Sequence, residues 1–259
     1  MTFLQVYLVG LGVAMGMMAL LWLASLALRN ASIVDIFWGA GFVLVGWVYF
    51  ALTPDGLPAR KGLAAILTTI WGLRLSLHIL RRNWGKPEDF RYAKWRAENG
   101  PSWWWRSAFK VFALQGVLLW IISAPLLGAQ RGNGAAGVLD VLGATVWAIG
   151  FFFEAVGDWQ LTRFKADPAN KGKLLTSGVW RYTRHPNYFG DSAQWWGYWL
   201  LAASAGAWWT IWAPILMTYL LLRVSGVALL EKSLATTKPG YEEYVRSTSA
   251  FVPLPPKRK

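Results

Sequence analysis

The amino-acid sequence predicts an all-α integral membrane protein, a bundle of about seven transmembrane helices. Of its 259 residues, 55% are hydrophobic and only 15% are charged, whereas soluble domains carry about 25% charge. Apolar runs of roughly 20 residues recur, each long enough to cross a hydrocarbon core about 30 Å thick. The runs are continuous rather than alternating, which disfavours a transmembrane β-barrel. We therefore expect a single membrane domain over 1–259.

The apolar runs give the expected spans in order. The first has no basic segment before it and is too long for the core of a signal peptide, so it counts as a span. The last two are joined only by SAGA, which predicts a tight hairpin. The seven expected spans are 3–28, 32–52, 63–80, 108–127, 136–162, 188–204 and 207–230.

The distribution of lysine and arginine predicts the orientation. Of 26 such residues, 20 lie in segments 29–31, 81–106, 163–187 and 231–259. The positive-inside rule places these segments in the cytoplasm, the N-terminus outside and the C-terminus inside, which an odd number of spans requires. The net charge of +13 is then explained by loops that face anionic lipid, so we expect no nucleic-acid partner.

Two residue counts limit the chemistry. The chain has no cysteine and two histidines, which excludes disulfides and thiolate metal sites and makes a metal centre improbable. The 19 tryptophans mostly fit an aromatic belt at the membrane interfaces. A minority inside spans, including Trp38 and Trp71, are candidates to line a pocket for a flat apolar ligand.

Ionisable residues inside the spans are candidate functional groups, because they are costly at membrane depth. Asp35 opens the second span in SIVDIFWGAGF, and Trp38 and Phe42 follow on its face at spacings of three and seven. The alternative is a carboxylate that only caps the helix. In the third span, Arg74 and His78 form a stripe with Trp71. The alternative there is a snorkelling arginine beside an interfacial histidine.

The fifth span ends with two carboxylates, Glu154 and Asp158, four residues apart on one helical face that Lys165 shares. One reading is that they pair with an arginine of a neighbouring helix. The other is that they accept hydrogen bonds from ribose hydroxyls or an amide of a polar ligand. Arg223 and Glu231 are expected on one face of the last span, where an interhelical salt bridge is again the alternative.

The stretch RYTRHPNYFGD, Arg181 to Asp191, crowds polar groups into the entry of the sixth span. A proline near the start of a helix is tolerated there, and a helix N-terminus beside basic residues is an anion site. Asn187 and Asp191 are four apart and should point the same way. We therefore expect one wall of a pocket for a phosphorylated, partly aromatic ligand.

GVWRYTRHPNYFGD, two spans, and then LLEK and PGYEEYVRSTSAFVP resemble the C-terminal half of the steroid 5-alpha-reductase family. Within it, the chain is most similar to a bacterial branch, and SIVDIFWG and NWGKPEDFRY extend the likeness towards the N-terminus. The resemblance implies an oxidoreductase of the bacterial inner membrane with cytoplasmic cofactor-binding loops. Residues 107–259 would bind NADPH, and residues 1–106 would supply the substrate side.

The same resemblance implies roles for individual residues. Asn187, Tyr188 and Asp191 match the family's Asn-Tyr-x-Gly-acid cofactor motif. Arg74 matches the arginine of the third span, with His78 as the aromatic donor one turn later. The sequence departs from the family at Val34-Asp35, where steroid reductases have Gln-Glu, and at Trp71, where they have tyrosine. The remaining residues expected to bind the cofactor are Lys86, Asp158, Lys165, Lys173, Tyr182, Arg184, His185, Arg223 and Glu231.

The implied reaction is reduction of the C=C bond of an α,β-unsaturated ketone, a steroid or terpenoid enone. Asp35, if desolvation against Trp38 and Phe42 keeps it neutral, would donate a hydrogen bond to the ketone oxygen. His78 is the alternative donor, and Arg74 would orient either donor or the nicotinamide amide. Trp38, Phe42 and Trp71 would cover the flat substrate.

Two other classes stay open. Isoprenylcysteine carboxyl methyltransferases and related lipid methyltransferases also carry an RHPxYxG motif and use S-adenosylmethionine. Residues 1–106 favour the reductase over this alternative. A transporter or lipid-binding protein is the third reading. Against a transporter stands the lack of a detectable internal repeat, which many transporters show.

Overall fold

The computed structural model describes residues 1–224 and 226–257, and over these residues the chain is helical with no strand. By their internal contacts the residues form two compact units. Unit 1 comprises Met1–Gly137 and Leu201–Thr210, and unit 2 comprises Val138–Leu200 and Ile211–Lys259. The predicted all-α class is confirmed. The expected boundary between residues 106 and 107 lies within unit 1.

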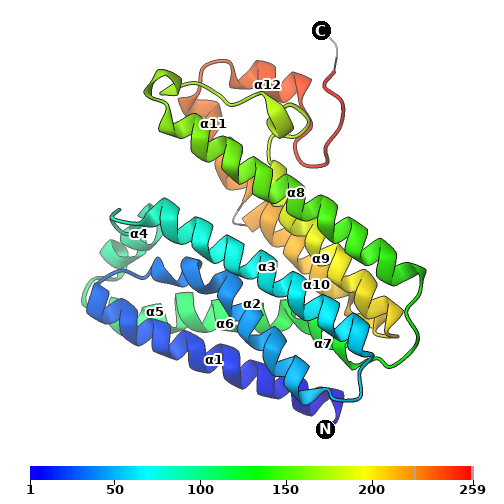
Figure 1. Ribbon diagram of the computed structural model, residues 1–259. Helices are drawn as coiled ribbons and strands as arrows, with labels where there is room; N and C mark the ends of the chain where they lie inside the picture. Colours follow the sequence, from blue (N-terminus) through cyan, green and yellow to red (C-terminus); the bar gives the residue numbers. More distant parts are fainter. Residues whose placement is uncertain (225, 258–259) are drawn as a thin grey trace. The chain divides into compact units, whose positions relative to one another are not determined.

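Unit 1 contains seven α-helices (Figure 1). A π-helical segment, Ala108–Ala113, joins the fifth to the sixth, and a 3-10 turn, Gly100–Ser102, precedes the fifth. The helices are α1 (Phe3–Leu28), α2 (Ile33–Leu52), α3 (Pro58–Asn83), α4 (Phe90–Asn99), α5 (Trp103–Ser107), α6 (Leu114–Ile122) and α7 (Ala124–Arg131).

Most of the remaining helices belong to unit 2, although α9 ends in unit 1. A second π-helical segment, Leu220–Val224, follows α10. Short 3-10 turns occur at Pro168–Asn170, Gly178–Arg181 and Trp208–Ile211. The helices are α8 (Val138–Ala166), α9 (Pro186–Ser204), α10 (Trp212–Tyr219), α11 (Val227–Thr237) and α12 (Tyr241–Ser247).

Five helical runs are long and apolar enough to cross a membrane: α1, α2, α3, the run Phe90–Arg131, and α8. Each overlaps one of the first five expected spans, and the expected spans 32–52 and 136–162 begin one and two residues before their helices. The other two expected spans correspond to α9 and to the shorter apolar run Trp208–Val224. The chain is therefore a multi-pass membrane protein. Polar residues make α9 less apolar than the other expected spans.

The helix ends of unit 1 follow local sequence signals. Thr2 and Gln5 form a reciprocal capping box at the start of α1, which satisfies two backbone donors. Arg29 ends α1 in the left-handed conformation, with φ of 51°. Pro58 opens α3, where its missing N–H costs nothing.

Pro125 explains the break between α6 and α7. Because proline has no N–H, it leaves the carbonyl of Ile121, four residues earlier, without its helical donor. The Tyr7 hydroxyl of α1 lies 3.2 Å from this carbonyl oxygen and 3.1 Å from that of Trp120, and can donate to them. The Ser123 hydroxyl at the break is 2.9 Å from the hydroxyl of Tyr49 on α2. Polar side chains of α1 and α2 therefore stabilise this interruption.

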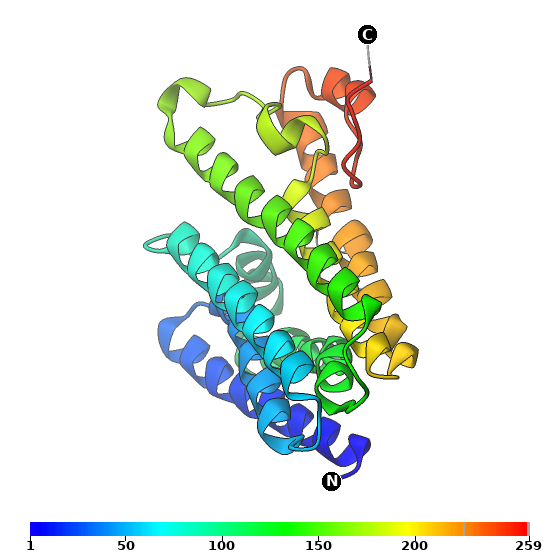
Figure 2. The same ribbon diagram turned by 45° about the vertical axis from the view of Figure 1, so that its right-hand side comes forward.

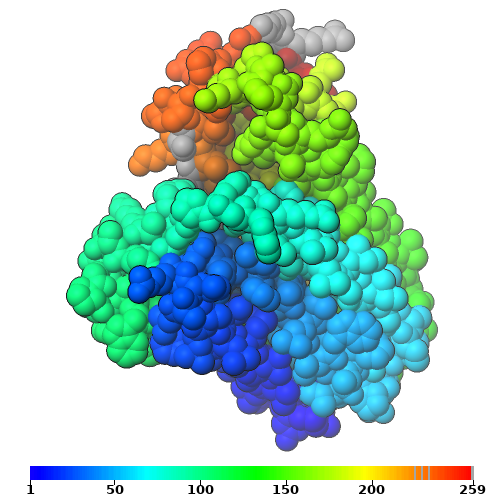
Figure 3. Space-filling model, turned by 60° about the vertical axis from the view of Figure 1, so that its left-hand side comes forward, coloured from blue at the N-terminus to red at the C-terminus, as the bar shows by residue number. Residues whose placement is uncertain are grey.

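Helices α2 and α3 approach each other at Gly39 and Gly72. A Cβ on either glycine would collide with the backbone of the other, so only glycine permits this distance. One turn further, the backbone N–H of Ala40 donates to the Ser76 hydroxyl at 2.9 Å. The space-filling view shows α1, α2 and the α3–α4 segment as one continuous surface of unit 1 (Figure 3).

Helices α8 and α9 of unit 2 lie side by side in both ribbon views (Figure 1, Figure 2). Their contacts fall at glycines spaced seven residues apart. A Cβ at Gly150 would lie 2.6 Å from the Gly190 carbonyl oxygen, and one at Gly197 would lie 2.7 Å from the Gly143 carbonyl oxygen. Gly157 packs against Pro186. The pairing is therefore antiparallel and close enough for side chains near the start of α9 to meet the last turns of α8.

The C-terminal tail is tied to the segment before α9. Thr183 and Ser249 form an isolated parallel bridge. The N–H of Arg184 donates to the Ser249 carbonyl at 2.9 Å, and the N–H of Leu254 donates to the Tyr182 carbonyl at 3.0 Å. The tail consists of the short helix α12 and the non-helical residues that follow it.

Candidate functional site

Asp35, in the first turn of α2, is the centre of a polar cluster in unit 1. The Tyr92 hydroxyl donates to Asp35 Oδ1 at 2.7 Å, and the Arg91 guanidinium donates to Oδ2 at 3.1 Å. Arg91 also pairs with Asp89 at 2.9 Å. The side chain of Asp35 keeps 20% of its surface exposed, so the carboxylate is held by two donors and still accessible.

These surroundings differ from those the sequence suggested. The hypothesis of a neutral Asp35 assumed an apolar environment formed with Trp38 and Phe42. An arginine within ion-pair distance and a phenol that donates both favour the ionised carboxylate, whereas burial favours the neutral form. The neutral Asp35 therefore stays a prediction, and Tyr92, which is 4% exposed, is a second group of this cluster that can carry a proton.

The loop before α4 holds Arg91 and Tyr92 in place. Glu88 accepts the backbone N–H of Ala31 at 2.6 Å and is bound by Arg96 at 2.9 Å. Asp89 caps α4 by accepting the Arg91 N–H at 3.0 Å, and its own N–H donates to the Ser32 hydroxyl at 3.3 Å. The loop thereby fastens the first turn of α4 to the start of α2.

Both carboxylates of this loop are ionised at neutral pH. Partial burial alone would raise the pKa of Glu88, but hydrogen bonds from Arg96 and Ala31 outweigh it and hold that pKa below its usual range. The pKa of Asp89 is lowered in the same way: burial opposes ionisation, and the bonds from Arg91 more than offset it. Both carboxylates therefore keep their charge at neutral pH, and their ion pairs hold the loop in place.

Gln115 completes the cluster from α6. Its side-chain amide donates to the Tyr92 hydroxyl oxygen at 3.2 Å. Gln115 lies two residues after the π-helical segment Ala108–Ala113, and π-helical turns inside helices are frequent at functional sites. Asp35, Tyr92 and Gln115 form one hydrogen-bonded row from three helices.

An aromatic row continues from this cluster along α2 and α3. The rings of Trp38 and Phe42 meet edge-to-face with centroids 5.5 Å apart, and Phe42 meets Trp71 at 5.6 Å. Phe42 and Trp71 are fully buried, whereas Trp38 is partly exposed. Of the three expected substrate-binding rings, Trp38 is therefore the accessible one.

The other candidates of unit 1 lie on α3 and after it. Arg74 and His78 are half-buried, three and seven residues beyond Trp71 on α3. Lys86 is exposed in the loop that precedes α4. The polar stripe expected on α3 stays a prediction.

In unit 2, two carboxylates of α8, Glu154 and Asp158, bind amide side chains of α9. Asn187 donates to Asp158 Oδ1 at 3.1 Å, and Gln194 donates to Glu154 at 2.5 Å. Glu154 and Asp158 are 3% and 7% exposed. Each carboxylate thus accepts a hydrogen bond from a neutral amide of α9, which the sequence reading had not considered.

Arg184 clasps the elements of unit 2 together. Its guanidinium pairs with Glu231 of α11 at 2.6 Å and donates to the backbone carbonyls of Thr248 and Val245. The side chain is 7% exposed. Arg184 therefore joins α11, the end of α12 and the entry to α9 with four hydrogen bonds.

His185 shares the Glu231 carboxylate with Arg184. Its Nε2 lies 3.3 Å from Glu231 Oε1, and its ring stacks on Tyr188 with centroids 5.8 Å apart. Burial lowers the pKa of His185 below its usual value, with the Glu231 carboxylate opposing and Arg184 assisting that shift. The imidazole is therefore neutral at physiological pH.

The remaining candidates of unit 2 are exposed or half-buried. Lys165, Lys173 and Tyr182 are exposed, and Asp191 is half-buried on α9. Arg223 is exposed in the π-helical segment. The expectation that Arg223 shares a helical face with Glu231 is wrong, because Glu231 lies in α11, which starts after Gly226.

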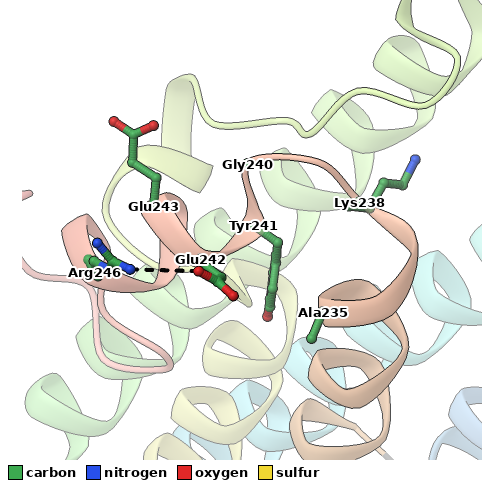
Figure 4. Close-up of a pocket in the computed structure, with 7 residues that line it drawn as sticks. All are labelled: Ala235, Lys238, Gly240, Tyr241, Glu242, Glu243 and Arg246. Carbon is green, nitrogen blue, oxygen red and sulfur yellow. Dashed lines mark ion pairs between the residues drawn. The ribbon is translucent and has the colours of Figure 1, made fainter.

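A pocket of about 420 Å³ opens between α11 and α12 of unit 2 (Figure 4). Tyr241 extends from the start of α12 toward Ala235, whereas Lys238 and Glu243 point away. Arg246 pairs with Glu242 at 3.6 Å along its rim. None of these residues was expected to bind a ligand, and the charges at the rim turn toward solvent or one another.

Four residues of these clusters were missed by the sequence reading: Arg91, Tyr92, Gln115 and Gln194. Arg91 and Tyr92 lie in NWGKPEDFRY, which the resemblance to reductases includes without assigning them a role. Gln115 and Gln194 are isolated amides inside apolar runs, and polar residues at membrane depth are candidate functional groups. That signal was applied to charged residues and should have been applied to amides.

Comparison with known proteins gives two matches. The model of a family described as "Protein of unknown function (DUF1295)" matches residues 21–248. An uncharacterized protein of Schizosaccharomyces pombe is 26% identical over 281 aligned positions, covering 95% of this chain and 79% of the yeast protein. No solved structure gives a significant match.

Proposed function

Because the chain belongs to the DUF1295 family, which is associated with steroid 5-alpha-reductase-like proteins, we propose that it is a membrane-embedded reductase. The substrate is an apolar α,β-unsaturated ketone of the steroid or terpenoid class, and the cofactor is NADPH. The reaction saturates the C=C bond. Unit 2 is assigned to the cofactor and unit 1 to the substrate.

The observation that carries the proposal is the hydrogen bond between Asn187 and Asp158. The two residues are 29 positions apart, and the resemblance assigns both to cofactor recognition. An amide beside a carboxylate offers donors and acceptors of the kind that a nicotinamide amide and ribose hydroxyls require. Their pairing at the entry of α9 supports a preformed polar wall.

The donor set of unit 2 fits a phosphorylated dinucleotide. Lys165 and Lys173 are exposed on the end of α8 and the loop after it, where flexible ammonium groups suit phosphate oxygens. Tyr182 is also exposed, and it precedes the buried residues Arg184 and His185 in the sequence. When bound, NADPH supplies a hydride, and the protein supplies position and a dry site.

Arg184 and Glu231 have a different role in this proposal from the one first expected. Their charges pair with each other, and Arg184 also donates to a backbone carbonyl. The role of the pair in this proposal is therefore to stabilise the wall of the site. His185 and Tyr188 extend the same clasp. These four residues are therefore positioning groups for the cofactor site.

At the substrate end, we assign the proton donor to Tyr92. As hydride reaches the β-carbon, negative charge develops on the ketone oxygen, and a hydrogen-bond donor stabilises it. The Tyr92 hydroxyl has one proton, which it donates to Asp35 in the free protein, so this O–H must turn to the ketone oxygen when the substrate binds. Gln115 holds the phenol oxygen, and Arg91 balances the Asp35 charge. A proton from solvent then adds to the α-carbon, which completes the saturation. Trp38 covers the substrate, and Arg74 and His78 line the adjoining face of α3.

The proposed location is the bacterial inner membrane, with the N-terminus outside and the C-terminus in the cytoplasm. The asymmetry of lysine and arginine supports this orientation. It brings the loop between α8 and α9, with Lys171 and Lys173, to the compartment that holds NADPH.

A methyltransferase remains the second candidate, for one specific reason. RHPNYFG and Glu231, which methyltransferases of this type also combine, lie in one cluster in unit 2 through the Arg184 clasp. The Tyr244 hydroxyl of α12 donates to the Trp180 carbonyl nearby. Such a cluster is compatible with S-adenosylmethionine.

Thermal stability of the purified protein with NADPH, NADH or S-adenosylmethionine separates the candidates. A ligand that binds only the folded state raises the melting temperature by mass action. We expect the largest rise with NADPH and its loss in Asn187→Leu, whereas Asn133→Leu, in an exposed loop of unit 1, should keep it. A rise with S-adenosylmethionine alone would favour the methyltransferase.

A further inference from the structure

The segment from Arg81 to Lys110 in unit 1, here called the basic aromatic rim, combines exposed rings with unpaired cations. It runs from the last turn of α3 through α4 and α5 into the π-helical segment, on the surface visible in Figure 3. Trp84 is 77% exposed, the highest value among the large apolar side chains described, and Phe90 and Phe109 are 71% and 69% exposed. Apolar rings of this size are costly to leave in water.

The charge of the rim is strongly unbalanced. It holds eight lysines and arginines and three carboxylates. Each carboxylate pairs with a cation of the rim itself: Glu88 with Arg96, Asp89 with Arg91, and Glu98 with Lys94. Among the described residues, no carboxylate lies within ion-pair distance of the five other basic residues, Arg81, Arg82, Lys86, Arg106 and Lys110.

Two of these cations are held over rings. The Arg106 guanidinium lies 5.4 Å from the centroid of Trp105, and the Lys110 ammonium lies 4.6 Å from that of Trp95. A cation over a ring face keeps its N–H donors directed at other acceptors. An aromatic ring and a positive charge therefore lie together at both positions. Both lie in the helical run Phe90–Arg131, which is long enough to cross a membrane.

We propose that the basic aromatic rim is a binding surface for anionic phospholipids. The rings rest at the boundary between headgroups and acyl chains, where tryptophan is enriched. The cations without a carboxylate partner bind phosphodiester oxygens, and Arg106 does so with the N–H groups that do not donate to Asn99. The occupant is a lipid with net negative charge, such as phosphatidylglycerol. Charge complementarity distinguishes it from a zwitterionic lipid, and the exposed rings distinguish it from free phosphate.

The test reconstitutes the full chain in nanodiscs of phosphatidylcholine alone or with phosphatidylglycerol and measures the melting temperature. The variant carries Arg81→Gln, Arg106→Gln and Lys110→Gln. The matched control removes the same charge at exposed positions outside the rim, with Lys171→Gln, Lys232→Gln and Lys257→Gln. Equal melting temperatures in pure phosphatidylcholine establish that all three proteins are folded.

Phosphatidylglycerol should raise the melting temperature of the wild type and of the control. The rim variant should lose that rise and bind a fluorescent phosphatidylglycerol at least about tenfold more weakly. Inorganic phosphate, added to the phosphatidylcholine discs, should have no effect. No rise in the wild type, or equal losses in the variant and the control, would overturn the proposal.

Discussion

The Tyr92 hydroxyl donates a 2.7 Å hydrogen bond to the Asp35 carboxylate, joining the start of α4 to the first turn of α2. Gln115 of α6 donates to the same hydroxyl oxygen, and Arg91 pairs with the same carboxylate. The phenol hydroxyl is therefore held by two neighbours, and the carboxylate that it faces keeps some exposure. In the proposed reaction its proton turns from Asp35 to the ketone oxygen.

Tyr92→Phe should lower the turnover of an enone by about 100-fold to 10,000-fold, the usual contribution of a positioned acid. The phenyl ring keeps the packing, so the rise in melting temperature with NADPH should be unchanged. Tyr219→Phe is the control, because Tyr219 is 56% exposed. Full turnover in Tyr92→Phe, with NADPH bound, would remove Tyr92 from the mechanism.

Gly150→Ala should destabilise the protein by about 1–3 kcal/mol or more, because its Cβ would meet the Gly190 carbonyl at 2.6 Å and backbone cannot yield cheaply. Gly12→Ala is the matched control in α1: nothing lies within 4 Å of its Cβ. There, alanine should be neutral or stabilising by about 0.5–1 kcal/mol. Thermal unfolding in detergent measures both, and equal effects would contradict the glycine contact.

Much of the fold could be predicted from the sequence, because a continuous apolar run predicts a membrane-spanning helix whichever helices it packs against. The predicted first and second spans match α1 and α2 to within one residue. The expected last span, 207–230, was drawn as one helix, but the described chain stops being helical at Val224 and resumes at Val227. Apolar composition alone does not mark such a break, although Gly226 offered a signal.

The candidate site was harder to predict for a physical reason. Helical periodicity places Asp35, Trp38 and Phe42 on one face, but it gives no information about which distant segment covers that face. The partner of Asp35 is 57 residues away, and that of Glu154 is 40 residues away. Both contacts depend on how helices pack, which requires the three-dimensional structure.

Gln130→Met should stabilise the protein. The side chain of Gln130 is fully buried in unit 1, and neither its Nε2 nor its Oε1 has a hydrogen-bond partner among the described residues. An unsatisfied buried amide costs about 1–3 kcal/mol, and methionine fills a similar volume. The melting temperature should rise.

Gln194→Met, in contrast, should destabilise the protein. Gln194 is equally buried, but its amide donates to the Glu154 carboxylate, so its loss removes a donor from a buried charge. The melting temperature should fall. If both variants shift it in the same direction, hydrogen bonding does not distinguish the two sites.

Folding stability should decrease as the pH falls below about 6.5, the usual pKa of histidine in an unfolded chain. Burial lowers the pKa of His185 in the folded protein, despite the facing Glu231 carboxylate and with the help of Arg184. The unfolded chain therefore binds the proton first, and stability is lost as the pH falls through this range toward the lowered pKa. Melting temperatures measured from pH 8 to pH 5 should fall less steeply for His185→Gln than for the wild type. Parallel curves would show that His185 does not titrate on unfolding.

The most direct test of the reductase proposal supplies NADPH deuterated at the transferring position of the nicotinamide, together with a panel of enones that begins with 3-oxo-4-ene steroids. The proposal predicts a saturated ketone that carries one deuterium at the former β-carbon, with one equivalent of NADPH oxidised per product. Deuterium on the carbonyl carbon, or no NADPH oxidation with any enone by folded protein that binds NADPH, would contradict it.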